Sequence, residues 1–367
     1  MPILTKAELR AHGAALNARN LPGSEAPFTT TRTSGSLGIP VEVRTTRTSR
    51  LVWNALTVRE HLWARREFGK RMGIIRYRRR DLRVPGGEDL LSWGPPVSEV
   101  RATGPASIIS IGSPVEELIT WLRRFDPHYL LTYPSVGVAL FEALGASGRT
   151  PALEDIRFMS EPLDAEFEAA LTRDWGVRVM DLYSANEVGH IAFRCRERGK
   201  LHVQSEAVLV EVLREDGSTC GPGDTGRVVV TALHNRATPL IRYELGDYAT
   251  VGTPCRCGRM HPVLERIQGR VRNLLRLHDG RRSWPTGLGR LRHVPVIAQA
   301  QYVQIEPDAI ELRIVAGREL TADERAAVTD LARSTLGFPF RIDILRVAEI
   351  PRGPTGKFEE FLSLLPP

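Results

Sequence analysis

The densest group of chemically specialised residues lies between Pro239 and Arg270, in the segment PLIRYELGDYATVGTPCRCGRMHPVLERIQGR. Within it, the step Gly246-Asp247 follows a β-branched and aromatic run. Glycine and aspartate are both disfavoured inside strands, so this step predicts a tight turn that presents the Asp247 carboxylate. What that carboxylate holds is decided by residues elsewhere in the chain.

The same segment contains Cys255 and Cys257, and an earlier part of the chain contains Cys195-x6-His202. Three thiolates and an imidazole suit a tetrahedral Zn²⁺ ion. The Cys-x-Cys spacing is not the usual Cys-x2-Cys, and Cys220 is left over. The residues leave two main interpretations open, a structural Zn²⁺ site or reduced cysteines without a metal, with a catalytic thiol as a weaker third. Four cysteines in so long a chain do not suggest a disulfide scaffold.

Residues 33–40, TSGSLGIP, combine hydroxyl side chains with glycines. The backbone N–H and hydroxyl donors of such a loop suit phosphate oxygens. No Gly-Lys-Ser/Thr ends the segment, so it is not a Walker loop. A flexible linker is the alternative that composition alone leaves open.

Two further motifs carry candidate chemistry. YSANEVG, residues 183–189, follows an apolar run that predicts a strand, and ligands gather at the carboxyl ends of strands in open α/β sheets. There Tyr183 offers a flat face for a base, and Glu187 is a candidate ligand for magnesium. Near the C-terminus, Lys357 stands in a Pro/Gly loop of a chain that almost always chooses arginine. Lysine supplies a compact charge that can be repositioned.

These residues need a scaffold, and the apolar periodicity of the chain predicts an α/β layered domain followed by β-rich segments. Ser113 and Glu116 suggest a capping box at the start of one helix. The strands and helices expected in this part lie at 50–68, 107–125, 129–144, 156–160, 164–175, 177–182, 207–213, 227–233 and 240–243.

After a basic, loop-like stretch beyond Arg270, the pattern indicates a ββαβ module of about 95 residues that could fold as a unit. Thr321 and Glu324 form the predicted capping box of its helix, and Gly337 ends that helix. Its strands are expected at 300–305, 309–315 and 341–347.

Composition bounds the class of protein. With 367 residues, 42% of them hydrophobic and 25% charged, the chain is expected to be a soluble globular protein with a large and a smaller domain. It has no run of 18 apolar residues and no signal-peptide pattern at its start, so we expect a cytoplasmic protein without a membrane partner. The net charge of +7 comes mainly from scattered arginines, and no nucleic-acid partner is expected. The cluster at 76–83 is a solvated face or an interface, and a homodimer is left open.

In their order along the chain, these motifs resemble those of the adenylate-forming superfamily, most closely its phenylacetate–CoA ligase-like branch. The resemblance extends from about Thr29 to Lys357. The matching segments are TSGSLGIPV, SEPLD, YSANEVG, TALHNRATPLIRYELGD, CRCGRMHPVLERIQGR and PRGPTGK.

The resemblance implies an adenylation domain over residues 1–271, with a β-rich subdomain at about 190–270, and an α+β lid domain over 272–367 that carries a catalytic lysine. The implied activity is ATP-dependent activation of a carboxylic acid, aromatic in this branch, as an acyl-adenylate with release of pyrophosphate. Transfer to coenzyme A would follow. The implied partners are therefore a small-molecule acid, ATP, Mg²⁺ and coenzyme A.

Roles of individual residues are implied by the same resemblance. Lys357 would bridge the attacking carboxylate and the α-phosphate, Glu187 would hold Mg²⁺, and Asp247 would accept the ribose hydroxyls. The other implied nucleotide contacts are Thr33, Ser34, Gly35, Ser36, Gly38, Glu161, Pro162, Tyr183, Ser184 and Arg270. The acyl-pocket candidates, for which a packing role is left open, are Tyr133, Ser135, Ala185 and His190.

The chain departs from the family pattern at several positions. Leu37 stands where the phosphate loop usually has a second hydroxyl, and Ser184 and Asn186 alter the signature after the strand. Arg272-Asn273 replace the expected hinge carboxylate, and about 30 residues before the phosphate loop predict a shortened N-terminal region. Two alternatives therefore stay open. The acyl-adenylate could pass to an amine, a carrier protein or a reductase, or the chain could bind nucleotide without turnover.

Overall fold

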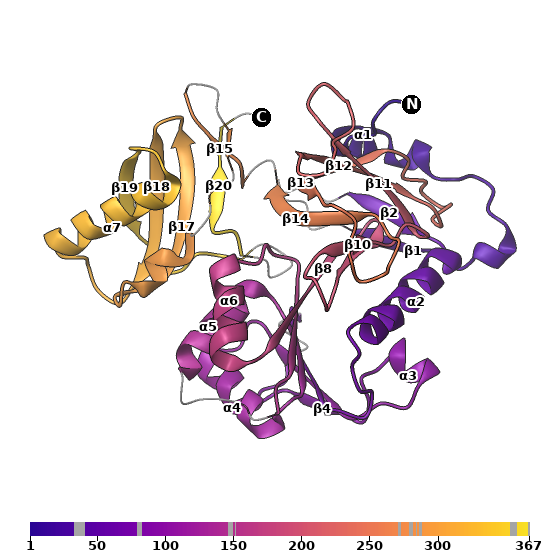
Figure 1. Cartoon of the computed structure of the whole chain (residues 1–367), viewed down its shortest axis with the longest axis horizontal. Helices are drawn as coiled ribbons and strands as arrows, with labels where there is room; N and C mark the ends of the chain where they lie inside the picture. Colours follow the sequence, from indigo (N-terminus) through magenta and orange to yellow (C-terminus); the bar gives the residue numbers. More distant parts are fainter. Residues whose placement is uncertain are drawn as a thin grey trace. The chain divides into compact units, whose positions relative to one another are not determined.

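The computed structural model describes residues 1–32, 41–78, 83–145, 150, 152–270, 273–278, 282–283, 285, 288–352 and 358–365 (Figure 1). The chain forms two compact units, the larger with most of residues 1–267 and the smaller with most of residues 268–365. Across the described ranges, no helix is both long enough and apolar enough to cross a bilayer.

The first part of the larger unit alternates strands with helices, as the periodicity predicts. Its strands are β3 (Met72–Arg76), β4 (Glu88–Leu90), β5 (Ala106–Ser110), β6 (Tyr129–Thr132), β7 (Asp155–Met159) and β8 (Arg178–Ala185). Its helices are α4 (Val115–Phe125), α5 (Pro134–Leu144) and α6 (Ala165–Trp175). The pairs β3–β5, β3–β6, β6–β7 and β7–β8 are parallel. In Figure 1 the three helices lie together beside these strands.

Burial explains this half of the sheet. Every residue of β5 is buried, which is typical of a parallel strand covered on both faces. On α4, the residues Leu118, Trp121 and Leu122 form the buried stripe. Gly176 follows α6 with a φ of 66°, a conformation that glycine adopts without steric cost, and it ends the helix.

The second part of the larger unit is β-rich and antiparallel. Its strands are β9 (Gly189–Arg194), β10 (Leu201–Val203), β11 (Val208–Leu213), β12 (Thr225–Ala232), β13 (Tyr243–Val251) and β14 (Val263–Arg270). Together with the first part, and counting only what the structure describes, they form a twelve-stranded sheet in the order β11-β12-β13-β14-β10-β9-β8-β7-β6-β3-β5-β4. The predicted α/β class with a β-rich part is confirmed.

Two expectations about this part are wrong. Gly246 and Asp247 do not form a turn after a strand, because both lie inside β13. The register against β12 jumps there, since Tyr248 pairs with Arg227 and Glu244 pairs with Val229. Gly246 has a φ of 76°, so the extra residues fit as a β-bulge, which aims side chains differently from a regular strand.

The segment after the β8 strand also differs from the prediction. Tyr183, Ser184 and Ala185 continue the strand, and Ala185 pairs with Gly189 across a tight hairpin to β9. Gly189 has a φ of 112°, which that hairpin requires and which most other residues avoid. Only Asn186, Glu187 and Val188 are therefore left as the loop.

The N-terminal residues add shorter elements to the larger unit. Strands β1 and β2 pair antiparallel and flank residues 33–40, which lie outside the described ranges. Thr46 caps α2 by accepting a hydrogen bond from the Ser49 backbone N–H at 3.1 Å. The elements are α1 (Lys6–Leu16), a short 3₁₀ helix (Gly23–Glu25), β1 (Thr29–Arg32), β2 (Glu42–Thr45), α2 (Arg47–Trp63) and α3 (Val97–Val100).

The smaller unit has the predicted ββαβ order, with an additional strand that runs parallel to β17. Its core gathers apolar residues such as Tyr302, Val328 and Phe361, all almost fully buried. Its elements are β15 (Leu275–Arg276), β16 (Arg282–Ser283), a 3₁₀ helix (Leu288–His293), β17 (Ile297–Glu306), β18 (Ala309–Ala316), α7 (Ala322–Leu336), β19 (Arg341–Arg346) and β20 (Phe361–Ser363).

Candidate functional site

Tyr183 and Asp247, both predicted from the sequence as nucleotide contacts, touch each other. The Tyr183 hydroxyl donates to Asp247 Oδ2 at 2.9 Å. Their strands, β8 and β13, are separated in the sheet by β9, β10 and β14, so the antiparallel part curls back on itself to bring them together. The Tyr183 ring packs into the core of this part and is 8% exposed. The bulge therefore presents Asp247 beside a fixed hydroxyl.

Glu187 lies next to this pair in the hairpin between β8 and β9. Its Oε1 accepts a hydrogen bond from the Tyr243 hydroxyl at 3.2 Å, and the residue is 6% exposed. Tyr243 begins β13, the strand that carries Asp247. A carboxylate has about four acceptor sites, so one hydroxyl partner leaves room for a cation. Glu187 fits the implied role as a Mg²⁺ ligand.

Lys6 supports the bulge from the N-terminal helix and was not identified from the sequence. Its Nζ donates to the Leu245 carbonyl oxygen at 2.7 Å, directly before Gly246. The helix that carries it is anchored by Leu9, which is 1% exposed. The capping box of Thr5 and Glu8 at the start of α1 was a local signal for this helix.

Glu161 and the acyl-pocket candidates Tyr133 and Ser135 lie at the N-terminus of α5. Glu161 Oε2 accepts a hydrogen bond from the Ser135 backbone N–H at 2.9 Å, which satisfies one of the free donors of that helix end. Tyr133 is buried in the core around Leu140, and its hydroxyl accepts from the Tyr77 backbone N–H at 3.5 Å. These contacts lie within the larger unit, and the nucleotide role of Glu161 and the acyl-pocket role of Tyr133 and Ser135 stay predictions.

His190 is the acyl-pocket candidate with the most distinctive surroundings. Its Nε2 lies 3.0 Å from Thr57 Oγ1, and its ring centroid lies 4.8 Å from that of Trp53. Since the Thr57 hydroxyl donates to the Trp53 carbonyl oxygen, His190 Nε2 carries the ring proton. Burial, with the charge of Arg157 adding to it, lowers the pKa of His190 to about 4.

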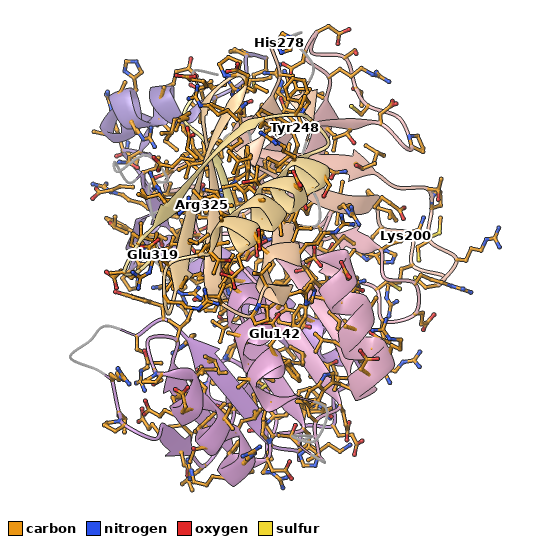
Figure 2. All side chains as sticks on the ribbon, turned by 90° about the vertical axis from the view of Figure 1, so that its left-hand side faces the viewer. Glu142, Lys200, Tyr248, His278, Glu319 and Arg325 are labelled. Atoms are coloured by element: carbon orange, nitrogen blue, oxygen red, sulfur yellow. The ribbon has the colours of Figure 1, made fainter. Side chains whose placement is uncertain are left out.

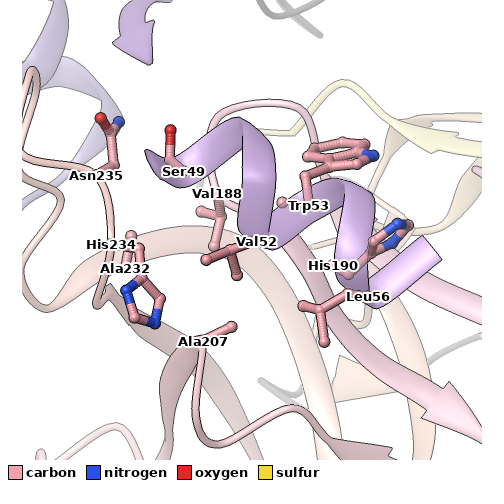
Figure 3. Close-up of a pocket in the computed structure, with 11 residues that line it drawn as sticks. Ser49, Val52, Trp53, Leu56, Val188, His190, Ala207, Ala232, His234 and Asn235 are labelled. Atoms are coloured by element: carbon pink, nitrogen blue, oxygen red, sulfur yellow. The ribbon is translucent and has the colours of Figure 1, made fainter. Parts of the chain in front are cut away.

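A small pocket adjoins His190 at α2 (Figure 3). Trp53 and His190 lie at one end of the lining residues, and Ser49 and Asn235 lie at the other. Neither Tyr183 nor Asp247 lines it, and Tyr133, Ser135 and Ala185 do not either. His190 and the Tyr183–Asp247 pair therefore do not share this pocket. The lining residues are Ser49, Val52, Trp53, Leu56, Val188, Gly189, His190, Ala207, Ala232, His234 and Asn235.

The four metal-ligand candidates Cys195, His202, Cys255 and Cys257 do meet. Their ligand atoms all lie within 4.8 Å of one another. Cys195 and His202 are buried, and Cys255 and Cys257 are half-buried in the loop between β13 and β14. Cys220, the cysteine left over from the predicted set, is also a buried free thiol and does not belong to this group.

Other predicted residues fall outside the described ranges or at their margin. Those outside are Thr33, Ser34, Gly35, Ser36, Leu37, Gly38, Arg272 and Lys357. Of the remaining nucleotide candidates, Ser184 and Pro162 are exposed, and Arg270 is the last residue of β14. Asn273 donates from Nδ2 to the Phe361 carbonyl oxygen inside the smaller unit, in place of the hinge carboxylate expected there.

No protein-family model matches the chain. Among curated proteins, it is 24% identical over 296 residues to phenylacetate-coenzyme A ligase of Thermus thermophilus, which covers 72% of this chain and 66% of that enzyme. It is 27% identical over 174 residues to the enzyme of the same name from Escherichia coli, covering 45% of this chain and 39% of that one. The chain thus spans less than two thirds of each of these relatives. These similarities confirm the resemblance predicted from the motifs.

Solved structures confirm the fold. A 2-hydroxyisobutyryl-CoA ligase in its postadenylation state matches with a TM-score of 0.74 at 19% identity, covering 99% of this chain and 80% of that one. An anthranilate CoA ligase solved with anthranoyl-AMP matches with a TM-score of 0.62 at 14% identity, covering 93% and 67%. An amide bond synthetase from Marinactinospora thermotolerans matches with a TM-score of 0.58 at 18% identity, covering 92% and 68%.

Proposed function

We propose that this chain activates a carboxylic acid with ATP. A carboxylate oxygen of the acid attacks the α-phosphorus, the bond to the β-phosphate oxygen breaks, and pyrophosphate leaves. The acyl-adenylate then reacts with the thiol of coenzyme A, forming a thioester and releasing AMP. An aromatic acid is the proposed substrate class, because the curated relatives carry the name phenylacetate-coenzyme A ligase.

The observation that carries this proposal is the meeting of Tyr183 and Asp247 at 2.9 Å within a fold shared with acyl-CoA ligases. The Asp247 carboxylate, which accepts from the Tyr183 hydroxyl, would also accept the two ribose hydroxyls of ATP. Bidentate hydrogen bonds to a charged group fix the nucleotide more firmly than neutral ones do.

Further residues would act on the triphosphate and the ribose. Glu187 would hold Mg²⁺, which offsets negative charge on the triphosphate, and the Tyr243 hydroxyl donates to its Oε1. Lys357 stays the proposed catalytic residue, positioned between the attacking carboxylate and the α-phosphate. The donors of residues 33–38 stay the proposed cradle for the β- and γ-phosphates, and Arg270 a ribose-side contact.

The acceptor after adenylation is the finer part of the proposal. Coenzyme A is favoured by the CoA ligases among the matching structures. An amine is the second candidate, because an amide bond synthetase shares the fold at a TM-score of 0.58. Both acceptors react with the same acyl-adenylate, so they can be compared on one enzyme preparation.

Acid-dependent exchange of labelled pyrophosphate into ATP tests the first step across a panel of aryl and alkyl carboxylic acids. Wild type should exchange with at least one acid. Asp247→Asn should lower kcat/KM for ATP by about 10- to 100-fold, because a charged hydrogen-bond partner is lost. Lys357→Ala should abolish exchange while ATP still binds. Binding of ATP without exchange for any acid would instead support a nucleotide-binding protein without turnover.

A further inference from the structure

We propose that Cys195, His202, Cys255 and Cys257 form a structural zinc site that closes the β13–β14 loop onto the β9–β10 hairpin, with Arg259 as its charge-compensating neighbour. The site is independent of the proposed adenylation chemistry. Its ligands come from two segments of the chain, and Cys195 in the first lies 60 residues before Cys255 in the second.

The distances between ligand atoms suit zinc. Zn–S bonds of about 2.3 Å in a tetrahedron place two sulfurs about 3.8 Å apart. Cys195 Sγ and Cys255 Sγ lie 4.0 Å apart, and Cys257 Sγ lies 3.4 Å from His202 Nε2. The sulfurs are too far apart for a disulfide, whose bond is about 2.05 Å. All four ligand atoms converge within 4.8 Å, so one ion could contact all of them.

The backbone explains the unusual Cys-x-Cys spacing. The chain turns at residues 256–258, so two cysteines only one residue apart can reach the same point, and Gly258, with a φ of 85°, redirects the chain after Cys257. In the hairpin, the Cys195 N–H donates to the Lys200 carbonyl oxygen at 2.6 Å. This closed turn holds Cys195 beside His202, which lies in the middle of β10.

Arg259 supplies positive charge to the sulfurs. Its Nη1 lies 3.5 Å from Cys257 Sγ and 3.9 Å from Cys195 Sγ. Three thiolates and a Zn²⁺ ion carry a net charge of about −1, which a guanidinium at this distance compensates. Neutral thiols would attract the guanidinium much more weakly than thiolates do.

The indole of Trp63 packs against two residues of the cluster. The guanidinium of Arg259 lies 4.6 Å from the ring centroid of Trp63, at the end of α2. The His202 ring meets the same indole edge-on at 6.1 Å. With Nε2 bound to the metal, the ring proton would lie on His202 Nδ1, which is buried without a hydrogen-bond partner among the described residues.

Other contacts besides the cysteines join the hairpin to the loop and to the strand that follows it, among them the backbone bond from the Val203 N–H to the Pro262 carbonyl oxygen at 2.8 Å. The Lys200 ammonium donates to Thr253 Oγ1 at 2.9 Å and pairs with Glu265 at 2.9 Å. The Lys200 side chain, labelled in Figure 2, is 23% exposed and that of Glu265 is 50% exposed, so solvent partly screens this pairing. His261 Nδ1 donates to the Val203 carbonyl oxygen at 2.9 Å. A metal would therefore add a link between the β13–β14 loop and the hairpin, beside the backbone pairing of β10 with β14.

Metal analysis of protein purified without chelators tests the site. We expect about one zinc per chain, and Cys257→Ser should lose it while Cys220→Ser keeps it. Cobalt exchanged into the wild type should show the visible bands of tetrahedral coordination with thiolate charge transfer. That measurement uses folded wild-type protein, so it decides the matter even where a cysteine variant fails to fold.

Arg259→Gln tests the neighbour, with Arg256→Gln as the matched control because Arg256 is exposed in the same loop. In competition with a zinc chelator, Arg259→Gln should weaken zinc affinity by about 10- to 100-fold, and Arg256→Gln should leave it unchanged. Zinc well below one equivalent, together with four reactive thiols in the native wild type, would overturn the site. Pyrophosphate exchange does not enter either readout, so the two proposals fail separately.

Discussion

The Tyr183 hydroxyl donates to Asp247 Oδ2 at 2.9 Å, although three other strands lie between β8 and β13 in the sheet. Tyr183 lies two residues before the end of β8, and Asp247 lies in the bulge of β13. The contact joins the two halves of the larger unit at the proposed nucleotide site. The orientation of the Asp247 carboxylate thus depends on both halves.

Tyr183→Phe should raise the KM for ATP by about tenfold, because a hydrogen bond to a carboxylate contributes about 1.5 kcal/mol. The turnover number should change much less, since Lys357 and the substrate acid are untouched. Tyr248→Phe is the matched control, because it also removes a tyrosine hydroxyl from a carboxylate, that of Glu215 at 2.7 Å. Equal KM values for the two variants would contradict the role of Tyr183.

Gly246→Ala should destabilise the protein by about 1–2 kcal/mol, because its φ of 76° is left-handed and unfavourable for alanine. It should also raise the KM for ATP, because the bulge aims Asp247. Gly223→Ala is the control, since Gly223 has a φ of 90° and open space around it. Both variants should lose similar stability in urea unfolding, and only Gly246→Ala should affect ATP. A raised KM for ATP in both variants would indicate that a general loss of stability, and not the bulge, causes the effect.

Local patterns predicted much of the fold. The capping box of Thr321 and Glu324 is present, with the Glu324 N–H at 3.2 Å from Thr321 Oγ1. The ββαβ order follows from the same short-range periodicity. Ser113 was wrongly predicted as a cap, because Pro114 takes the extended N-cap position and α4 begins at Val115 without a side-chain cap. There the chain turns before the helix, with the Ser113 N–H donating to the Ser110 carbonyl oxygen.

Long-range contacts could not be predicted from the sequence. The bulge at Gly246 depends on the register against β12, which no local pattern encodes. Tyr243 and Lys6 support Glu187 and Leu245 from 56 and 239 residues away. The metal-ligand candidates were identified because cysteine and histidine are conspicuous by type, whereas Arg259 is one among many arginines. Its contact with two sulfurs is a product of the folded loop.

Glu60→Gln should destabilise the larger unit by about 3–5 kcal/mol, because it removes a buried charge from two guanidinium partners. Glu60 Oε2 lies 2.7 Å from Arg66 Nη1 and 2.5 Å from Arg157 Nη1, and Arg66 also binds Asp155. Asp174→Asn, which breaks an exposed pair with Arg173, should cost less than about 0.5 kcal/mol. Urea unfolding compares them, and similar losses would show that the buried network contributes little.

The same network makes the stability of the larger unit depend on pH in the acid range. Burial opposes the charged form of Glu60, but Arg66 and Arg157 outweigh it and hold the pKa of this carboxyl well below its ordinary value. The stability it contributes is therefore complete above about pH 4.5 and is lost as the pH falls further. Wild type should lose more stability than Glu60→Gln between pH 4.5 and pH 3.

His190 should add a second, separate pH dependence. Its folded pKa of about 4 lies below its ordinary value of 6.5, because the proton would go to the buried Nδ1, which has no hydrogen-bond partner among the described residues. The unfolded chain binds more protons between these values, so stability falls as the pH drops from 6.5 towards 4. From pH 7 to pH 5 this one group should cost about 2 kcal/mol. His190→Gln, which keeps a donor for Thr57, should therefore lose about 2 kcal/mol less than wild type over that interval in urea unfolding. Parallel losses in the two proteins would mean that His190 is protonated in the folded state as readily as in the unfolded chain.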